Sequence, residues 1–319
     1  MSSYSAQPVR ADLNVAAMSV GTDETDVFLA DDMFPIFSSA HASAVFERYG
    51  VEVDTQLPAG SGERATGADF DETKYAKTQD SYKTREYGLK GVIDNATELN
   101  ADRHFREEVK TVTRLRRIVR TLRDRRAANL TINNSVYANG TSMGTNVGAV
   151  WSGAGTPIGD IIDACNAVRA ACAYWPNTLR MSHEAFFELS MNTETAARLN
   201  TTVDNGAFVE LPRLSALLNI PKILIDNVPY NLSPDGVAPA IGRVWDKTKV
   251  FLSYTRTDDT LEDVQFGRTV AYDEGLGGGV GQSVSWGDHP RMQEYAHFMN
   301  VEEKILVAEC GYALHNVLS

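Results

Sequence analysis

The sequence predicts an α+β fold in which extended segments, one long helix and a mixed helix and strand region follow one another. Three observations carry this prediction. Residues 44–54 and 81–93 have the β-branched and aromatic content of strands, and a Gly-rich tip lies between them. Residues 95–130 have a helical period. Short helices and strands alternate after residue 156.

Composition places the chain among ordinary soluble proteins. Its 319 residues are 43% hydrophobic and 23% charged, enough for one large or two medium domains. The start has no basic region followed by an apolar run, and no apolar stretch approaches the roughly 20 residues that span a bilayer. Three cysteines exclude a disulfide framework. We therefore expect a soluble, cytosolic product with no membrane partner.

The first part of the chain predicts an arm and an unsupported hairpin. Residues 1–26 are small and polar without a period, typical of an arm ordered on a neighbour or not at all. The apolar stretch 28–37 is suited to docking. The two extended segments predict a long hairpin with little apolar surface. Because an isolated hairpin is marginal in water, it must lie on a remote part of this chain or on another subunit.

The long helix combines an apolar stripe with a concentration of arginine. The stripe consists of Phe105, Val109, Val112, Leu115, Val119 and Leu122. At about 1.5 Å per residue, residues 95–130 would form a rod of roughly 45 Å or more. Residues 103–126 hold ten Lys or Arg and three Asp or Glu, a charge of +7, so the chain total of −12 leaves −19 elsewhere. These arginines either meet an acidic partner or pair with the chain's own carboxylates.

The second half predicts a compact helix and strand region. Thr156 and Pro157 have the order of a hydroxyl cap and a first-turn proline. The helix they open has a buried face made of Ile158, Ile161, Ile162, Cys165, Val168 and Cys172. Further predictions are strands over 178–181, 222–225 and 244–254, helices over 183–191 and 214–218, a mobile Gly loop over 275–281, and one long strand over 304–314 that contains a buried Cys310 and closes a sheet.

No pattern of catalytic, metal or cofactor residues emerges. The Gly loop at 275–281 contains no lysine and matches no phosphate-binding motif. The six histidines have no metal-ligand spacing, and no nucleophile motif occurs. We therefore predict no catalytic residue, no cofactor and no metal. Recognition of nucleic acid is disfavoured because the chain is acidic and the arginines surround the helix except along its stripe.

The order of elements resembles a known family. Weak local matches occur at residues 34–36, 84–94, 157–161, 176–182, 223–226 and 244–247. Together they resemble the major capsid proteins of tailed bacteriophages, which have the Hong Kong 97-type capsid fold and to which encapsulin shells and the floor domain of herpesvirus capsids are similar. The resemblance covers about residues 28–319 and implies an N-arm, an E-loop hairpin, a P-domain with a long spine helix and sheet, and an A-domain.

The resemblance also implies domain ranges. These are the N-terminal arm at 1–40, the E-loop hairpin at 41–94, the P-domain spine helix and following segment at 95–155, the A-domain at 156–285 and a C-terminal return to the P-domain sheet at 286–319. Inter-subunit contacts are expected from Arg64, Lys74, Arg85, Arg116, Arg117, Arg120 and Arg123. Lysines 74, 77 and 83 lie in or near the hairpin, but no catalytic Glu is placed by motif, so no covalent crosslink is assigned.

The implied function is structural. The chain would be a non-enzymatic major capsid protein that self-assembles, as hexamers and pentamers, into the icosahedral head shell around the genome of a tailed double-stranded DNA phage. It would be found in the virion after assembly in the host cytoplasm. Expected partners are a separate scaffolding protein, because no long charged helical segment precedes the hairpin, then a portal, a decoration protein and DNA contacted non-specifically at most. The alternatives are an encapsulin-like compartment and an enzyme of unrecognised class.

Overall fold

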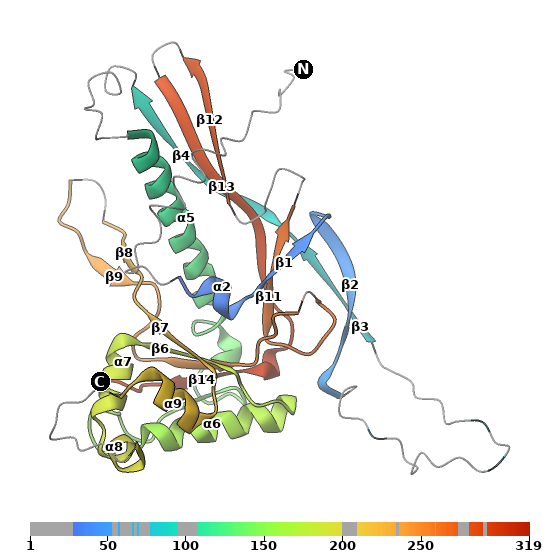
Figure 1. The fold of residues 1–319 in the computed structure, drawn as a ribbon, viewed down its shortest axis with the longest axis vertical. Helices are drawn as coiled ribbons and strands as arrows, with labels where there is room; N and C mark the ends of the chain where they lie inside the picture. Colours follow the sequence, from blue (N-terminus) through green and yellow to red (C-terminus); the bar gives the residue numbers. More distant parts are fainter. Residues whose placement is uncertain are drawn as a thin grey trace.

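Two five-stranded sheets and a long helix organise the part of the chain that the structure describes (Figure 1). The computed structural model describes residues 28–52, 57, 66, 69, 77–94, 107–199, 209–233, 236–258, 260–273, 281–289 and 292–319. The predicted arm at 1–26, most of the hairpin tip and the loop at 275–280 lie outside these ranges. None of the described helices is long and apolar enough to cross a membrane.

The first sheet is built around β13 (Met292–Ile305), the longest of the described strands. One edge of β13 pairs antiparallel with β4 (Arg85–Asp94) over ten residues. The other edge pairs antiparallel with β12 (Gln282–His289) and then with β11 (Gly267–Tyr272). β1 (Ile36–Ser39) adds a parallel strand beside β11. The sheet thus joins segments from both ends of the chain.

Helix α5 (Glu107–Leu130) lies along one face of this sheet (Figure 1). Val112 packs with Ile93 of β4 and Tyr295 of β13. Val119 packs farther along the helix, among residues of β11 and β13. The close approach requires glycine at position 91, because a Cβ there would lie 2.7 Å from the Thr111 side chain. The predicted long helix is confirmed over the described residues.

The predicted stripe of α5 is right in its first turns and wrong at its end. Val112, Leu115 and Val119 are buried as expected, and Phe105 lies outside the described residues. Leu122 is exposed, and the buried positions of the next turn are Arg123 and Asp124. The error arises because a pattern of apolar residues cannot register charged side chains that are buried with partners.

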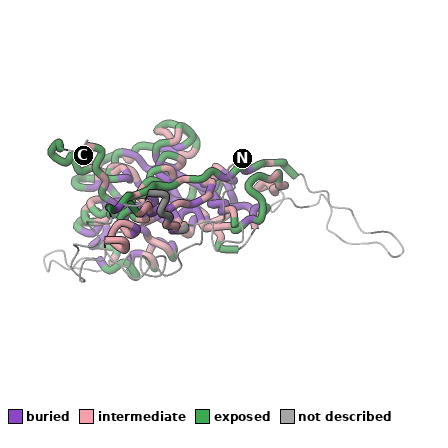
Figure 2. Tube along the Cα trace, turned by 90° about the horizontal axis from the view of Figure 1, so that it is seen from above, coloured by how far each residue is buried: buried purple, intermediate pink, exposed green. Residues whose placement is uncertain are grey.

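The second sheet has the order β5 (Gly144–Asn146), β14 (Gly311–His315), β10 (Val250–Ser253), β6 (Thr178–Ser182) and β7 (Lys222–Asp226). β14 runs antiparallel to β10 and β10 runs antiparallel to β6. β6 and β7 are parallel. Every residue of β14, β10 and β6 is buried, as expected of strands covered on both faces, whereas β5 and β7 at the edges are partly exposed. Figure 2 shows that buried residues gather in the body and that exposed residues lie along its outside.

Helices α6 (Pro157–Cys172), α7 (His183–Met191), α8 (Thr193–Leu199) and α9 (Leu211–Leu218) accompany the second sheet (Figure 1). The buried face of α6 was predicted correctly, including both cysteines, although Ile162 is only partly buried. Its cap differs from the prediction. The Thr156 side chain makes no capping bond; instead, a carboxylate oxygen of Glu194 accepts a bond of 3.1 Å from the Ile158 amide.

Two hairpins project from opposite sides of the molecule in Figure 1. One consists of β2 (Ser43–Tyr49) and β3 (Lys77–Lys83), and the other of β8 (Pro229–Asn231) and β9 (Ile241–Arg243). The β2–β3 hairpin is fixed at its base to the first sheet. The Tyr82 hydroxyl lies 2.6 Å from Ser39 Oγ, and the Lys83 amide donates to Glu302. The hairpin was predicted to lie either on a remote part of the chain or on another subunit, and the first of these is observed for its base.

Two predicted strands are each divided between sheets. The segment 81–93 breaks at Thr84, so its first residues belong to the hairpin and the rest forms β4 in the first sheet. The single strand predicted over 304–314 is wrong, because a 3-10 turn (η3, Ala308–Cys310) separates the end of β13 from β14. Cys310 is buried in that turn. Segment 286–319 therefore contributes to both sheets.

Candidate functional site

The arginines of α5 lie in two different surroundings. One set points toward the first sheet and toward α2 (Ala30–Met33), a short helix near the start of the described chain. There Asp31 accepts bonds from Arg120 at 2.9 Å and from Arg123 at 2.5 Å. Burial alone would raise the pKa of Asp31, but the two guanidinium charges hold it below its usual value. This carboxylate therefore neutralises part of the helix within the chain.

Glu303 of β13 neutralises further arginines of α5. Its carboxylate accepts two bonds from Arg126, at 3.0 and 2.8 Å, and Arg123 Nε lies 3.4 Å away. The Arg126 guanidinium also stands 3.8 Å from the ring centre of Tyr87 on β4. Arg123 is almost fully buried and further donates to Thr269 of β11. These contacts fix α5 to three strands of the first sheet.

Asp124 of α5 caps helix α2 from a distant part of the sequence. Its two carboxylate oxygens accept the backbone amides of Leu29 at 3.1 Å and Ala30 at 2.9 Å. The Trp245 indole donates to the same carboxylate at 3.4 Å. Complete burial outweighs these bonds and raises the pKa of Asp124 to about 6. Asp124 thereby holds the beginning of the described chain against the long helix.

Arg116 occupies a positively charged corner between α5 and β13. Its Nη1 atom is buried and has no hydrogen-bond partner among the described residues. Burial, and then the charge of Arg120, lower the pKa of Arg116. Across from it His297 is buried, with Nδ1 3.0 Å from Ser283 Oγ. Burial, and then Arg116 and Arg120, lower the pKa of His297 to about 4, so this imidazole is neutral near pH 7.

The opposite side of α5 forms an apolar groove with the β8–β9 hairpin. The groove encloses about 550 Å³. Its apolar lining comes from α5 and from the hairpin: Ile118, Leu122, Tyr230, Leu232 and Ile241. Arg114, Arg117 and Arg125 stand along it on the helix side, and Arg125 lies 5.9 Å from the Tyr230 ring centre. The structure thus places basic and apolar side chains together on an exposed surface.

The seven residues predicted to contact other subunits fall into three groups. Arg64 and Lys74 lie outside the described residues. Arg85 of β4 and Arg117 of α5 are exposed, and Arg116 and Arg120 are partly buried. Arg123 is buried in bonds to its own chain. A role between subunits therefore stays a prediction for the others, whereas the observed contacts of Arg123 join parts of one subunit.

Three carboxylates that are buried or paired at α5 were not predicted from the sequence: Asp31, Asp124 and Glu303. A partial signal existed for Arg123, because Val112, Val119 and Arg123 follow the helical steps of seven and four. No comparable signal marked Asp31 or Glu303, which reach α5 only through tertiary structure. Arg180 and Asp226 were missed for the same reason. This fully buried pair in β6 and β7 has Nη2 and Oδ1 2.9 Å apart.

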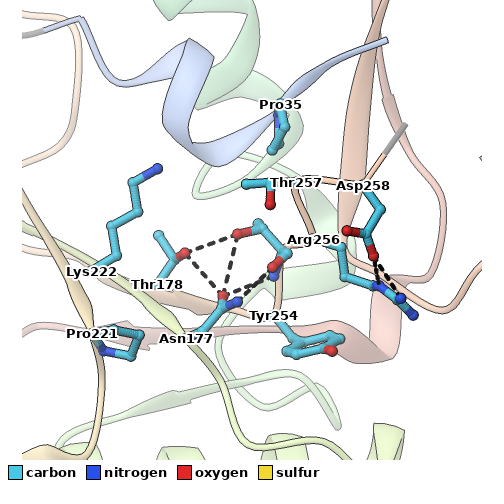
Figure 3. Close-up of a pocket in the computed structure, with 10 residues that line it drawn as sticks. Pro35, Asn177, Thr178, Pro221, Lys222, Tyr254, Arg256, Thr257 and Asp258 are labelled. Carbon is cyan, nitrogen blue, oxygen red and sulfur yellow. Dashed lines mark hydrogen bonds and ion pairs between the residues drawn. The ribbon is translucent and has the colours of Figure 1, made fainter. Parts of the chain in front are cut away.

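A polar recess of about 590 Å³ lies where α2, β6 and β7 meet the segment after β10 (Figure 3). Its central side chain, Asn177, accepts from the Thr255 amide at 2.9 Å and from Thr178 Oγ1 at 3.1 Å. At one side Arg256 donates twice to Asp258. The dashed lines in Figure 3 mark these bonds, whereas Lys222 at another side of the recess pairs with Asp32 of α2. Nowhere among the described residues do three or more His, Cys, Asp or Glu side chains form a metal-binding group.

Comparisons with known proteins agree on one kind of relative. No protein-family model matches the chain. A major capsid protein of Pseudomonas phage JBD67 is 21% identical over 252 residues, which cover 78% of this chain and 79% of that protein. A phage-related protein from Bordetella bronchiseptica has a similar structure, with a TM-score of 0.71 at 18% identity over 98% of both chains.

More distant structural matches point the same way. The capsid of cyanophage P-SCSP1u has a TM-score of 0.56 at 12% identity, covering 91% of this chain and 88% of that one. A virus-like particle from Pyrococcus furiosus has a TM-score of 0.55 at 12% identity, covering 96% and 99%. The chain therefore has the Hong Kong 97-type fold and is similar in sequence to a major capsid protein of a phage.

Proposed function

We propose that this chain is the structural major capsid protein of a tailed double-stranded DNA phage and that it self-assembles into the icosahedral head shell. The observation that supports this most is the similarity to a phage major capsid protein over more than three quarters of both chains. The fold itself is shared with a virus-like particle from an archaeon, so it does not separate phage shells from encapsulin-like compartments. The sequence relationship favours the phage shell.

The arrangement of the subunit is consistent with a shell. The β2–β3 hairpin projects from one side of the subunit, and the β8–β9 hairpin projects from the other side (Figure 1). A contact between two different surfaces of neighbouring subunits is heterologous and generates rings when the rotation between them closes, and in this proposal the rings are hexamers and pentamers. We assign the first sheet and α5 to the P-domain and the second sheet with α6–α9 to the A-domain. No catalytic step is part of this function.

The remaining expectations form part of the same proposal. Assembly takes place in the host cytoplasm with a separate scaffolding protein, a portal and, on the outside, a decoration protein. DNA is contacted non-specifically at most. Neighbouring subunits meet at the hairpin, through Arg64 and Lys74, and at Arg85, Arg116, Arg117 and Arg120. The support for the helix contacts is the buried Nη1 of Arg116, which has no hydrogen-bond partner in the described part of its own chain.

Negative-stain electron microscopy of the expressed chain tests the proposal. Icosahedral or closed shell-like particles are expected, whereas a monomer or small oligomer under all assembly conditions would contradict a shell function. The genetic neighbourhood separates the two kinds of shell, because portal and terminase genes accompany a phage capsid and a cargo enzyme accompanies an encapsulin. Uniform shells of native size from the purified chain alone would refute the need for a scaffolding protein.

A further inference from the structure

The two basic sides of α5 differ in how their charge is balanced. On the side facing α2 and β13, Arg120 and Arg126 pair with Asp31 and Glu303 of the same chain. On the groove side, no ion pair joins Arg114 or Arg125 to a carboxylate in the described parts of the chain. Within the part of the chain that the structure describes, Arg114 and Arg125 therefore have no carboxylate partner.

The same side leaves large apolar side chains in contact with solvent. Ile118 and Leu122 of α5 are 47% and 42% exposed, and Ile241 of β9 is 74% exposed. These three line the groove together with Tyr230 and Leu232. A contiguous exposed apolar surface bordered by charge is typical of a binding site. An occupant must bury these side chains and supply negative charge.

These requirements define the chemistry of the occupant. Carboxylates suit the exposed guanidinium groups of Arg114 and Arg125, because the planar guanidinium can bond both carboxylate oxygens. Large apolar side chains suit the floor of the groove. Nucleic acid offers the charge but no matching apolar surface, so DNA is the poorer fit. The groove encloses about 550 Å³, within the roughly 300–1,000 Å³ of sites that take small ligands, so a short segment is enough to fill it.

We propose that the groove between α5 and the β8–β9 hairpin docks a short acidic segment of a separate protein, with large apolar side chains between Asp or Glu residues. The proposal rests on the shell function, because a shell presents the groove many times. A contact that is weak at one groove becomes strong when a multivalent partner engages many grooves at once. It also reverses readily when that partner is removed, as an assembly partner requires.

The test uses synthetic peptides as probes. A fluorescent peptide of Leu, Ala and Glu is compared with two matched peptides, one with Lys in place of Glu and one with Ser in place of Leu. Fluorescence anisotropy is measured with purified particles and with the unassembled chain. The Leu and Glu peptide should bind both and weaken as salt is raised. The Lys and Ser peptides should bind at least about tenfold more weakly, a difference of about 1.4 kcal/mol.

Variants then locate the binding surface. Arg125→Gln and Leu122→Ser should each weaken binding of the Leu and Glu peptide by about tenfold. Arg169→Gln is the matched control, because Arg169 is an exposed arginine on α6 outside the groove. Arg125 is itself exposed, so Arg125→Gln remains informative if Leu122→Ser does not fold.

Each contrary outcome overturns the proposal in a different way. Binding to the unassembled chain but not to particles would show that a second copy fills the groove. Displacement of the peptide by a DNA oligonucleotide, with equal loss in Arg125→Gln, would identify a nucleic-acid surface. If the Leu and Glu peptide binds neither the particles nor the unassembled chain, the groove is not a docking site. The experiment distinguishes failure of the shell function from failure of the docking proposal. If the chain forms no shell, electron microscopy shows no particles while the unassembled chain still binds the peptide.

Discussion

Arg126 of α5 and Glu303 of β13 form a two-bond ion pair, with donor to acceptor distances of 3.0 and 2.8 Å. The Glu303 side chain is almost fully buried, and Arg123 lies 3.4 Å from the same carboxylate. One carboxylate thus compensates two guanidinium groups at the interface between the long helix and the central strand. Its removal would leave the partly buried Arg126 without this carboxylate and Arg123 with Asp31 as its remaining ion-pair partner among the described residues.

Glu303→Gln should lower the free energy of unfolding by about 3 kcal/mol, because breaking a buried pair leaves an uncompensated charge. Urea unfolding of the unassembled chain measures this change. Glu294→Gln is the control, since Glu294 pairs with the exposed Lys90 at 3.3 Å and its loss should cost less than about 1 kcal/mol. Equal effects in the two variants would show that Glu303 does not fix α5 to the sheet.

Arg116→Ala should leave folding nearly unchanged and lower particle yield. Within the residues that the structure describes, the buried Nη1 of Arg116 forms no hydrogen bond, so truncation removes none from that atom there. The bond that we propose between Arg116 and a neighbouring subunit would be lost in the variant. Urea unfolding and particle yield by sedimentation are the two measurements. Arg120→Ala should lower yield as well, with some loss of stability because Arg120 pairs with Asp31. Normal yields from both variants would contradict contacts between subunits here.

Asp124→Asn should change how stability depends on pH. The pKa of this carboxyl is raised from 3.8 to about 6 in the folded chain. The contribution of this carboxyl to the free energy of unfolding is therefore greatest below pH 4 and is lost as the pH rises through about 6. The difference between wild type and variant in unfolding free energy should fall by up to about 3 kcal/mol across that window. Urea unfolding of both proteins from pH 4 to 7 provides the test. If the difference in unfolding free energy between wild type and variant does not change with pH, the pKa of Asp124 is not raised.

His297→Gln should have the opposite pH signature. The pKa of His297 is lowered from 6.5 to about 4, so the neutral imidazole contributes fully above pH 6.5 and loses its contribution as the pH falls toward 4. The charges that face it are Arg116 and Arg120 of α5, and Ser283 of β12 is its hydrogen-bond partner. The same urea series should show wild type losing up to about 3 kcal/mol relative to the variant on acidification. If the free energy of unfolding of wild type does not fall relative to that of the variant, the His297 imidazole is exposed to solvent and not buried.

Asp226→Asn should destabilise the second sheet strongly. Arg180 and Asp226 are both fully buried, and Arg180 also donates to the carbonyls of Asp246 and Lys249. Loss of the carboxylate leaves a buried cation, at a cost of about 3–5 kcal/mol. The double variant Arg180→Met with Asp226→Leu should cost less than the sum of the single changes. Additive losses in thermal unfolding would argue against coupling between the two groups.

Local patterns predicted the elements of the second half well. Helix α7 has the predicted bounds, β6 agrees within a residue, and α6 begins at the predicted Pro157. Each is marked by a contiguous apolar pattern with its own start or stop signal, which is information held within one segment. The strand predicted over 244–254 is correct only at β10, because the preceding residues are held in turns.

Pairing between distant segments could not be predicted in this way. β11, β12 and the first part of β13 were not identified, although Tyr295, His297, Met299 and Val301 alternate into the core. The polar members of such an alternation, His297 and Glu303, conceal it from a search for apolar residues. The groove has the same origin, because Leu122 and Ile241 meet only after α5 and the β8–β9 hairpin come together.

The break at Thr84 has a mechanical consequence. β3 continues into β4 through this single residue, whose amide and hydroxyl both bond the Ala42 carbonyl. A pull on the β2–β3 hairpin therefore becomes tension along β4, where ten residue pairs with β13 share the load in shear. In a shell under outward pressure, strain at one subunit's hairpin would pass directly into the central strand of its sheet, with no flexible linker in between.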